Sequence, residues 1–355
     1  MPTYWLVHAA ASLMLAPTAS GASAGPPDRA WAAQATTRSS VENLSFEGSG
    51  AVLKGTLHLP HGTSKVPAVI VLHAASSPSR DEALYAHLLE MLPALGIAVL
   101  TYDRRGTGAS TGDEKGNGFD VLVEDGIAAA KTVARHKRID PSRIGFWGLS
   151  QGGWLSLLAA TRHKQTAFAI SVSAPMVTPD VQMNFAVANI LRIKGHSDAD
   201  IAQAIDARTA VDEFQRGRLD RASAQNRLDA AVNKPWFNLI YLDRTFSDPD
   251  KSGWAKEIRH DPLQSIGAVT APALILYGAV DPWVPVQTSV ERLKPFVSAH
   301  PNFSLYVINR ADHAMMSGAS PTRQIDPASF PSQAPDSAEY FAILAAWLQK
   351  NVLDR

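Results

Sequence analysis

Short apolar runs alternate with amphipathic helical patterns over most of the chain after residue 41. Runs of continuous or alternating apolar positions predict strands at residues 52–59, 67–72, 97–102, 144–147, 168–172, 273–277 and 304–308. Apolar residues at helical spacing predict helices at residues 81–95, 119–136, 151–161, 288–297 and 338–348. Because strands alternate with helices, we expect an α/β fold with a mostly parallel sheet covered by helices on both faces.

The alternation stops between residues 178 and 260, where every pattern is helical. Thr178-Pro179-Asp180 is typical of a helix start, with a capping residue followed by proline in the first turn. We expect this insert to form a cap over the carboxyl edge of the sheet, where open α/β sheets bind ligands. The predicted organisation is a core at residues 41–177, a helical cap at 178–260 and the rest of the core at 261–355.

The first residues have the composition of an export signal. Residues 1–24 contain no Asp, Glu, Lys or Arg, are mostly apolar from Tyr4 to Leu15, and end in Ala22-Ser23-Ala24. We interpret residues 1–24 as a signal peptide and 25–40 as a linker, so that the mature protein is periplasmic or secreted. A disordered leader or a misplaced start codon is the alternative. The apolar run is too short for a stable membrane span, and Pro17 follows it closely.

Composition limits the chemistry that is available. The 33 Lys and Arg residues balance 33 Asp and Glu residues, so the net charge gives no reason to expect nucleic acid as a partner. The chain has no cysteine, which excludes a disulfide framework, a thiolate metal site and a cysteine nucleophile. The histidines are scattered without metal-binding spacing, and we expect no metal and no organic cofactor.

The strongest motif is Gly148-Leu149-Ser150-Gln151-Gly152, which lies between a predicted strand and a predicted helix. A serine on such a sharp strand-to-helix turn has an exposed hydroxyl, and its neighbours two positions away must be small because their backbones meet. The helix that follows directs its N-terminus at the serine and favours negative charge there. We therefore predict that Ser150 is a nucleophile.

A serine nucleophile needs a base, and the base needs an acid to orient it. His313 is the best-placed histidine, because it follows the strand at residues 304–308 late in the chain. Asp281 follows the strand at 273–277 and is the preferred acid, with Asp180 and Asp312 as rivals. The negative charge of the tetrahedral intermediate also needs two donors. We expect these to be the backbone N–H groups of Gln151 and, from the loop at residues 73–78, of Ala75.

These segments resemble the α/β-hydrolase superfamily, above all its bacterial esterase and serine-aminopeptidase-like branch, which is related to the catalytic domain of prolyl oligopeptidases. The matching segments are residues 73–82, 102–110, 139–154, 276–285 and 311–313. The resemblance implies an α/β-hydrolase fold with a helical cap insertion. It also implies the order nucleophile, acid and base for Ser150, Asp281 and His313, with Ala75 and Gln151 forming the oxyanion hole.

One position departs from the family pattern. Ala74 stands where the family usually has glycine in the oxyanion loop, and a positive φ there would cost an alanine about 1 kcal/mol. The glycine-rich stretch at residues 102–110 lacks the spacing of a phosphate-binding loop, and we interpret it as a structural turn beside the site.

The leading functional hypothesis is a serine hydrolase that cleaves small-molecule carboxylic esters through an acyl-enzyme on Ser150. Residues proposed to line an apolar pocket are Trp154, Met176, Trp283 and Met315, with Met183, Phe185 and Met316 as further candidates. The alternatives are a peptidase or amidase that uses the same triad, an acyltransferase or lactonase, and a binding module without catalysis. Nothing in the sequence indicates an oligomeric state.

Overall fold

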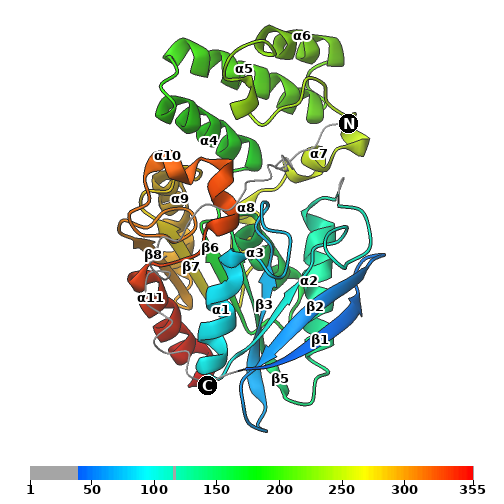
Figure 1. Cartoon of the computed structure of the whole chain (residues 1–355), viewed down its shortest axis with the longest axis vertical. Coiled ribbons are helices and arrows are strands. Elements are labelled where there is room, and N and C mark those ends of the chain that lie inside the picture. The colour runs from blue at the N-terminus through cyan, green and yellow to red at the C-terminus, as the bar shows by residue number, and fades with distance from the viewer. Residues whose placement is uncertain (1–38, 115–116, 355) are drawn as a thin grey trace, which may run out of the picture.

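The structure, a computed structural model, describes residues 39–114 and 117–354. Its centre is a sheet of eight strands in the order β1-β2-β4-β3-β5-β6-β7-β8 (Figure 1). The strands are β1 Ser40–Glu47, β2 Val52–Leu59, β3 Val66–Leu72, β4 Ala98–Tyr102, β5 Ile139–Leu149, β6 Phe168–Val172, β7 Ala273–Gly278 and β8 Phe303–Ile308. Strand β2 pairs antiparallel with both of its neighbours, and all pairs from β4 to β8 are parallel. The predicted α/β class with a mostly parallel sheet is confirmed.

Among the strands that the structure describes, β1 is the one that the apolar pattern did not predict. It lies at the edge of the sheet, and Phe46 is its only fully buried residue. An edge strand with exposed side chains has no apolar period, so its sequence resembles that of a loop. Ser40, the last residue of the expected linker, already belongs to β1. The predicted signal peptide and the linker up to residue 38 lie outside the described residues.

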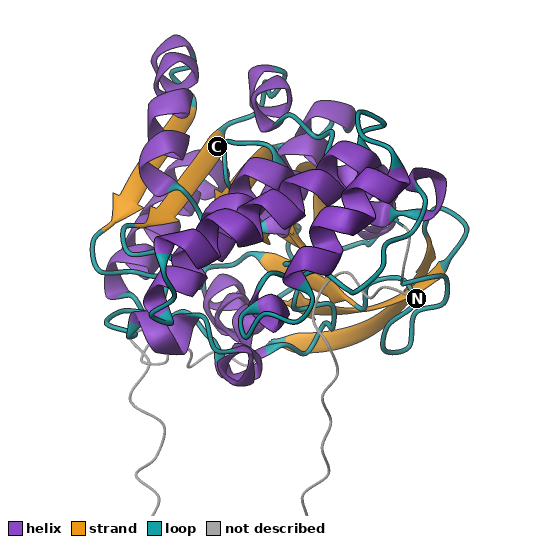
Figure 2. Ribbon diagram, turned by 90° about the horizontal axis from the view of Figure 1, so that it is seen from above, coloured by secondary structure: helices purple, strands orange, loops and turns teal. Residues whose placement is uncertain are grey.

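Helices cover both faces of the sheet (Figure 2). The side chains of Ala68, Ile70 and Leu72 in β3 pack in one core, and those of Val69 and Val71 pack in another. The first core includes residues of α2 (Phe119–Val133), α3 (Gln151–Arg162), α8 (Pro262–Gly267) and α9 (Val286–Ala299), and the second includes residues of α1 (Ala83–Ala94) and α11 (Ala338–Leu348). This alternation explains why the central strands are continuous apolar runs, since both of their faces are buried.

A helical insert connects β6 to β7 and has a hydrophobic core of its own. It consists of α4 (Pro179–Ile193), α5 (Asp198–Gln215), α6 (Arg221–Ala231), the 3₁₀ turns η2 (Phe237–Leu239) and η3 (Pro249–Lys251), and α7 (Gly253–Glu257). Helix α5 begins with a capping box between Ser197 and Asp200. In Figure 1, α4, α5 and α6 form a layer beyond the end of the sheet, apart from the helices of the core.

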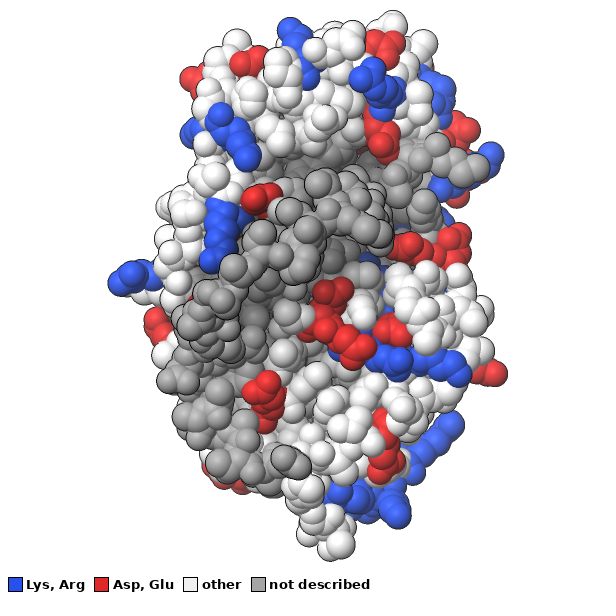
Figure 3. Space-filling view, viewed as in Figure 1, with Lys and Arg blue, Asp and Glu red and all other residues white. Residues whose placement is uncertain are grey.

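The remaining elements lie after β8. The loop to α11 contains the short helix α10 (Pro321–Gln324) and the 3₁₀ turn η4 (Pro327–Ser332), and the chain ends in a π-helical turn, η5 (Gln349–Leu353). Across the described ranges, every helix is too short or too polar to span a bilayer. On the face in Figure 3, basic and acidic side chains of the described residues are interspersed, as the balanced charge leads one to expect.

Candidate active site

Ser150 occupies a strained turn between β5 and α3. Its backbone has φ 57° and ψ −119°, in a region that non-glycine residues seldom adopt, and its N–H donates to the carbonyl of Val172 at 2.8 Å. A Cβ atom on Gly148 would collide with the carbonyl oxygen of Gly152, and one on Gly152 would collide with that of Leu72. The turn can therefore close only if both of these positions are glycine.

Asp281 and His313 form a hydrogen-bonded pair at the carboxyl ends of β7 and β8. The Nδ1 atom of His313 lies 2.7 Å from Oδ2 of Asp281. The other oxygen, Oδ1, accepts the backbone N–H groups of Trp283 at 2.7 Å and Val284 at 3.1 Å. The Asp281 side chain has no exposed surface. These contacts hold the carboxylate in one orientation and direct Oδ2 at the imidazole ring.

The carboxylate also determines the proton affinity of the ring. Burial lowers the pKa of His313, but the charge and hydrogen bond of Asp281, together with the charge of Asp312, outweigh it and raise the pKa above the ordinary value. The hydrogen bond to Asp281 places the proton of the neutral ring on Nδ1 and leaves Nε2 free as an acceptor.

The two rival acids have other partners. Asp180 lies in the first turn of α4 and forms an ion pair at 2.8 Å with Arg216, the residue that follows α5. Asp312 turns back on its own loop, where Oδ1 accepts the N–H groups of Ala314 at 2.9 Å and Met316 at 2.8 Å. Burial raises the pKa of Asp312 to about 6. Neither carboxylate is hydrogen-bonded to the His313 ring in the part of the chain that the structure describes.

Ser150 and His313 line a cavity of about 910 Å³, its open mouth included, between the sheet and the insert. Of the residues proposed for its wall, Trp154, Met183 and Trp283 line it. Trp283 is held by hydrogen bonds from Nε1 to the carbonyl of Gln324 at 3.2 Å and from Gln182 of α4 to its own carbonyl at 3.0 Å.

The structure does not bring four other candidates to this wall. Met176 and Met315 are fully buried in the cores on opposite faces of the sheet, where each fills space between elements. Met316 is buried in the same core as Met315, and Phe185 is partly exposed on α4. These four residues were predicted to line the cavity because they lie near the motifs in the sequence. In the structure they are not among the residues that line it.

Sequence reasoning missed several residues of the cavity. Phe119, Trp254 and Phe330 add aromatic surface, and Glu257 of α7 contributes a carboxyl group that is 6% exposed. Burial raises the pKa of Glu257 to about 8, although the charge of Arg104 opposes this shift. Trp254 and Glu257 belong to the insert, for which no motif was recognised, so no signal in the sequence connected them with Ser150.

The loop after β3 brings Ala75 to the cavity that Gln151, at the start of α3, also lines. Among the described residues, neither backbone N–H group has a hydrogen-bond partner within the chain. Ala74 is not one of the non-glycine residues with positive φ, so the alanine that departs from the family pattern causes no strain there. Tyr85 holds the loop, because its hydroxyl accepts the N–H of Ala74 at 3.1 Å and donates to the carbonyl of Ser77 at 2.7 Å.

His73 has a structural environment. Its Nε2 donates to the carbonyl of Tyr102 at 2.5 Å, and burial together with the charge of Arg104 lowers its pKa to about 3. Within residues 39–114 and 117–354, no three His, Asp or Glu side chains are grouped as a metal ion would require.

Comparison with known proteins matches part of the chain to a family model. The family model of the serine aminopeptidase S33 hydrolases matches residues 66–229, which include Ser150. A polyketide transferase of Stachybotrys chlorohalonatus is 33% identical over 140 residues, which are 39% of this chain and 45% of that protein. A thiohydrolase of Aspergillus aculeatus is 31% identical over 38% of this chain and 41% of that protein. This chain thus matches about half, or less, of the length of these relatives.

Three other likenesses cover more of the molecule. An uncharacterised 31.7 kDa protein of Escherichia coli is 30% identical over 232 residues, which are 64% of this chain and 76% of that protein. The solved structure of a Pyrococcus furiosus esterase superposes with a TM-score of 0.56 over 88% of this chain and 92% of its own, at 17% identity. An acylaminoacyl peptidase of Pyrococcus horikoshii has the same TM-score over 89% of this chain and 42% of its own, at 12% identity. With its eight-stranded, mostly parallel sheet, the chain belongs to the α/β-hydrolase superfamily.

Proposed function

We propose that this protein is a serine hydrolase that cleaves carboxylic esters through an acyl-enzyme on Ser150. The observation that carries the proposal is the 2.7 Å hydrogen bond between the fully buried Asp281 and His313, which lines the same cavity as the strained Ser150. A base and a nucleophile that share a cavity, with an acid behind the base to orient it, are the requirements for acyl transfer.

In the first half of the reaction, Oγ of Ser150 attacks the ester carbonyl carbon while Nε2 of His313 takes the hydroxyl proton. Asp281 accepts the Nδ1–H bond and stabilises the imidazolium that forms. The N–H groups of Ala75 and Gln151 donate to the oxyanion, which lies near the N-terminus of α3. His313 then returns the proton to the leaving alkoxide, and the alcohol departs from the acyl-enzyme.

In the second half, water replaces the alcohol. Nε2 of His313 takes a proton from water, the resulting oxygen nucleophile attacks the acyl carbon, and the collapse of the second tetrahedral intermediate returns the proton to Oγ of Ser150. The products are one carboxylic acid and one alcohol, and the residues return to their starting protonation states.

A second candidate is acyl transfer from a thioester or to a nucleophile other than water. The relatives include a polyketide transferase and a thiohydrolase, and the segments that they share with this chain are 33% and 31% identical, respectively. The apolar, aromatic wall of the cavity is suited to an extended acyl chain. The same triad would perform the first half of this reaction.

The test is to measure initial rates of the purified chain on matched aryl esters, aryl thioesters and aryl amides of increasing acyl length, with Ser150→Ala as the paired variant. We expect ester turnover to exceed amide turnover greatly and to vanish in Ser150→Ala without a change in melting temperature. Thioester turnover far above ester turnover would favour the second candidate. Comparable amide turnover would favour the peptidase alternative, and full activity in Ser150→Ala would refute the mechanism.

A further inference from the structure

Arg104 contacts both sides of the proposed oxyanion hole. It follows β4 by two residues, and its Nη2 atom lies 3.1 Å from the carbonyl oxygen of Ala74 and 3.3 Å from that of His73. The same nitrogen lies 2.8 Å from Oε1 of Gln151. One guanidinium nitrogen therefore connects the loop after β3 with the first residue of α3.

The contact with the carbonyl of Ala74 affects the Ala75 N–H donor of the oxyanion hole. The carbonyl of Ala74 and the N–H of Ala75 belong to the same planar peptide unit, so fixing one fixes the direction of the other. A cation at the carbonyl oxygen also draws electron density from the N–H bond and makes that N–H a stronger donor. In this arrangement Arg104 strengthens the Ala75 donor without touching the substrate.

The contact with Gln151 acts on the second donor. The side chain of Gln151 is held between Arg104 on one side and Glu257 of α7 on the other, with its Nε2 atom 3.5 Å from Oε1 of Glu257. Gln151 is 6% exposed and lines the cavity, and its side-chain amide is engaged on both sides. The anchor at Oε1 restricts rotation of this first residue of α3.

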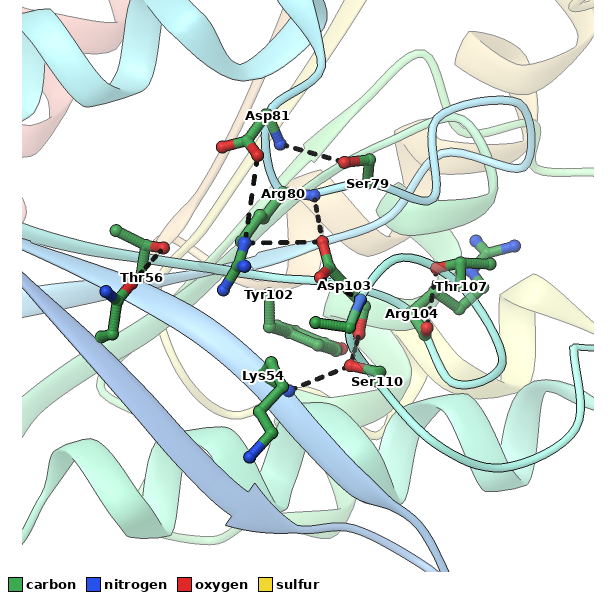
Figure 4. A network of polar contacts seen from close by, with 12 residues as sticks. Lys54, Thr56, Ser79, Arg80, Asp81, Tyr102, Asp103, Arg104, Thr107 and Ser110 are labelled. Atoms are coloured by element: carbon green, nitrogen blue, oxygen red, sulfur yellow. Dashed lines mark hydrogen bonds and ion pairs between the residues drawn. The ribbon is translucent and has the colours of Figure 1, made fainter.

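The backbone around Arg104 is fixed by a polar network (Figure 4). The N–H of Arg104 donates to the carbonyl of Pro78 at 2.9 Å, and its carbonyl accepts the hydroxyl of Thr107 at 2.7 Å. Asp103 accepts the N–H groups of Arg80 at 3.1 Å and Ala109 at 2.9 Å, which joins the loop after β4 to the loop after β3. The glycine-rich stretch thus forms a hydrogen-bonded turn that places Arg104 beside the hole.

We propose that Arg104 is a positioning residue that orients both backbone donors of the oxyanion hole and polarises that of Ala75. The inference rests on the proposed function, since an oxyanion hole has a role only if Ser150 attacks a carbonyl group. Removal of one oxyanion donor costs about 10²–10³-fold in kcat, so loss of a residue that acts through the donors should cost about 10- to 100-fold.

The test is Arg104→Met, which keeps the length of the side chain and removes its charge and donors. We expect kcat to fall about 10- to 100-fold with KM changed less than about threefold, because the interaction strengthens in the transition state. A trifluoromethyl ketone that matches the ester, and forms a tetrahedral adduct on Ser150, should bind more weakly by the same factor. Arg104→Lys should recover part of the loss.

Arg80→Met is the matched control, because Arg80 joins the same two loops through Asp103 and contacts neither donor. Its kcat should stay within about twofold of the wild type. An equal loss in Arg80→Met, or a fall in Arg104→Met that appears only in KM or in melting temperature, would overturn the inference. If Arg104→Met does not fold, Gln151→Met, which keeps the backbone N–H, should still lower kcat, and full kcat there would contradict the proposal.

The two failures can be told apart. If turnover persists in Ser150→Ala, the proposed function itself is wrong. If turnover depends on Ser150 but Arg104→Met keeps wild-type kcat and inhibitor affinity, only the role of Arg104 is wrong.

Discussion

Replacement of Asp281 by asparagine should disable the base while leaving the site in place. In the structure, Oδ1 of Asp281 accepts the N–H groups of Trp283 and Val284, so the asparagine carbonyl oxygen must take that position. The asparagine NH₂ group then faces Nδ1 of His313, which lies 2.7 Å from Oδ2 in the wild type. Because an NH₂ group only donates, Nδ1 becomes an acceptor and the ring proton moves to Nε2.

A proton on Nε2 blocks the step that His313 must perform, since that nitrogen can no longer accept the proton of Ser150. For triads of this kind the wrong tautomer lowers kcat about 10⁴-fold, which corresponds to about 5.5 kcal/mol of transition-state stabilisation. The two backbone hydrogen bonds at Oδ1 are retained, so the melting temperature of Asp281→Asn should change little. The pKa of His313 should fall, because the carboxylate that raises it has been removed.

The assay is kcat/KM on the preferred aryl ester across a range of pH, with thermal unfolding measured in parallel. Asp180→Asn is the control, because Asp180 pairs with Arg216 and not with the imidazole. A loss below tenfold in Asp281→Asn, or a larger loss in Asp180→Asn, would refute the assignment of the acid.

Three further predictions concern the turn, the base and the core. Gly152→Ala places a methyl group against the carbonyl of Leu72 and should lower the unfolding free energy by about 3 kcal/mol or more and abolish activity. In the control Gly50→Ala the added Cβ meets no atom within 4 Å, so the loss should be only about 1 kcal/mol, for the positive φ. Equal losses of unfolding free energy in chemical denaturation would contradict this. Because the pKa of His313 is raised and the neutral ring is the base, kcat/KM should rise with pH through a midpoint above 6.5, and a midpoint below 6 would be inconsistent with the ion pair. Burial lowers the pKa of His87 to about 3. Between about pH 6.5 and pH 3, His87 is therefore protonated in the unfolded state and neutral in the folded state. As pH falls through that range, the unfolding free energy should decrease by up to about 1.4 kcal/mol per pH unit for this one group. Urea unfolding at pH 7 and pH 5 measures this slope, and a phenylalanine at position 87 should reduce it.

The sequence predicted those parts of the site that depend on local geometry. The turn at Ser150 requires glycine at 148 and 152, a strand before it and a helix after it, and all of these are adjacent in the chain. The positions of Asp281 and His313 could be predicted because parallel strands end at the same edge of a sheet, which brings the loops after β7 and β8 together.

The predictions failed where a side chain's direction decides the outcome. Met176 and Met315 lie near the motifs in sequence, yet each points into a core, because packing on each face of the sheet determines which side chains reach the cavity. Ala74 departs from the family pattern, yet the loop accepts it without positive φ, since Tyr85 and Arg104 hold the backbone in another way. Backbone angles of a loop depend on partners that are distant in the chain.

By itself the sequence determined the fold class, the strands from β2 to β8 and the strand–turn–helix motif, because apolar periodicity and steric limits act between residues that are near one another in the chain. Only the tertiary structure decided which groups surround the nucleophile. Arg104 and Gln151 are 47 residues apart and Gln151 and Glu257 are 106 apart, and no short motif relates such positions. Arg104, Gln151 and Glu257 come into contact because the insert and two loops pack against one edge of the sheet. Such long-range packing is a property of the whole chain rather than of any segment.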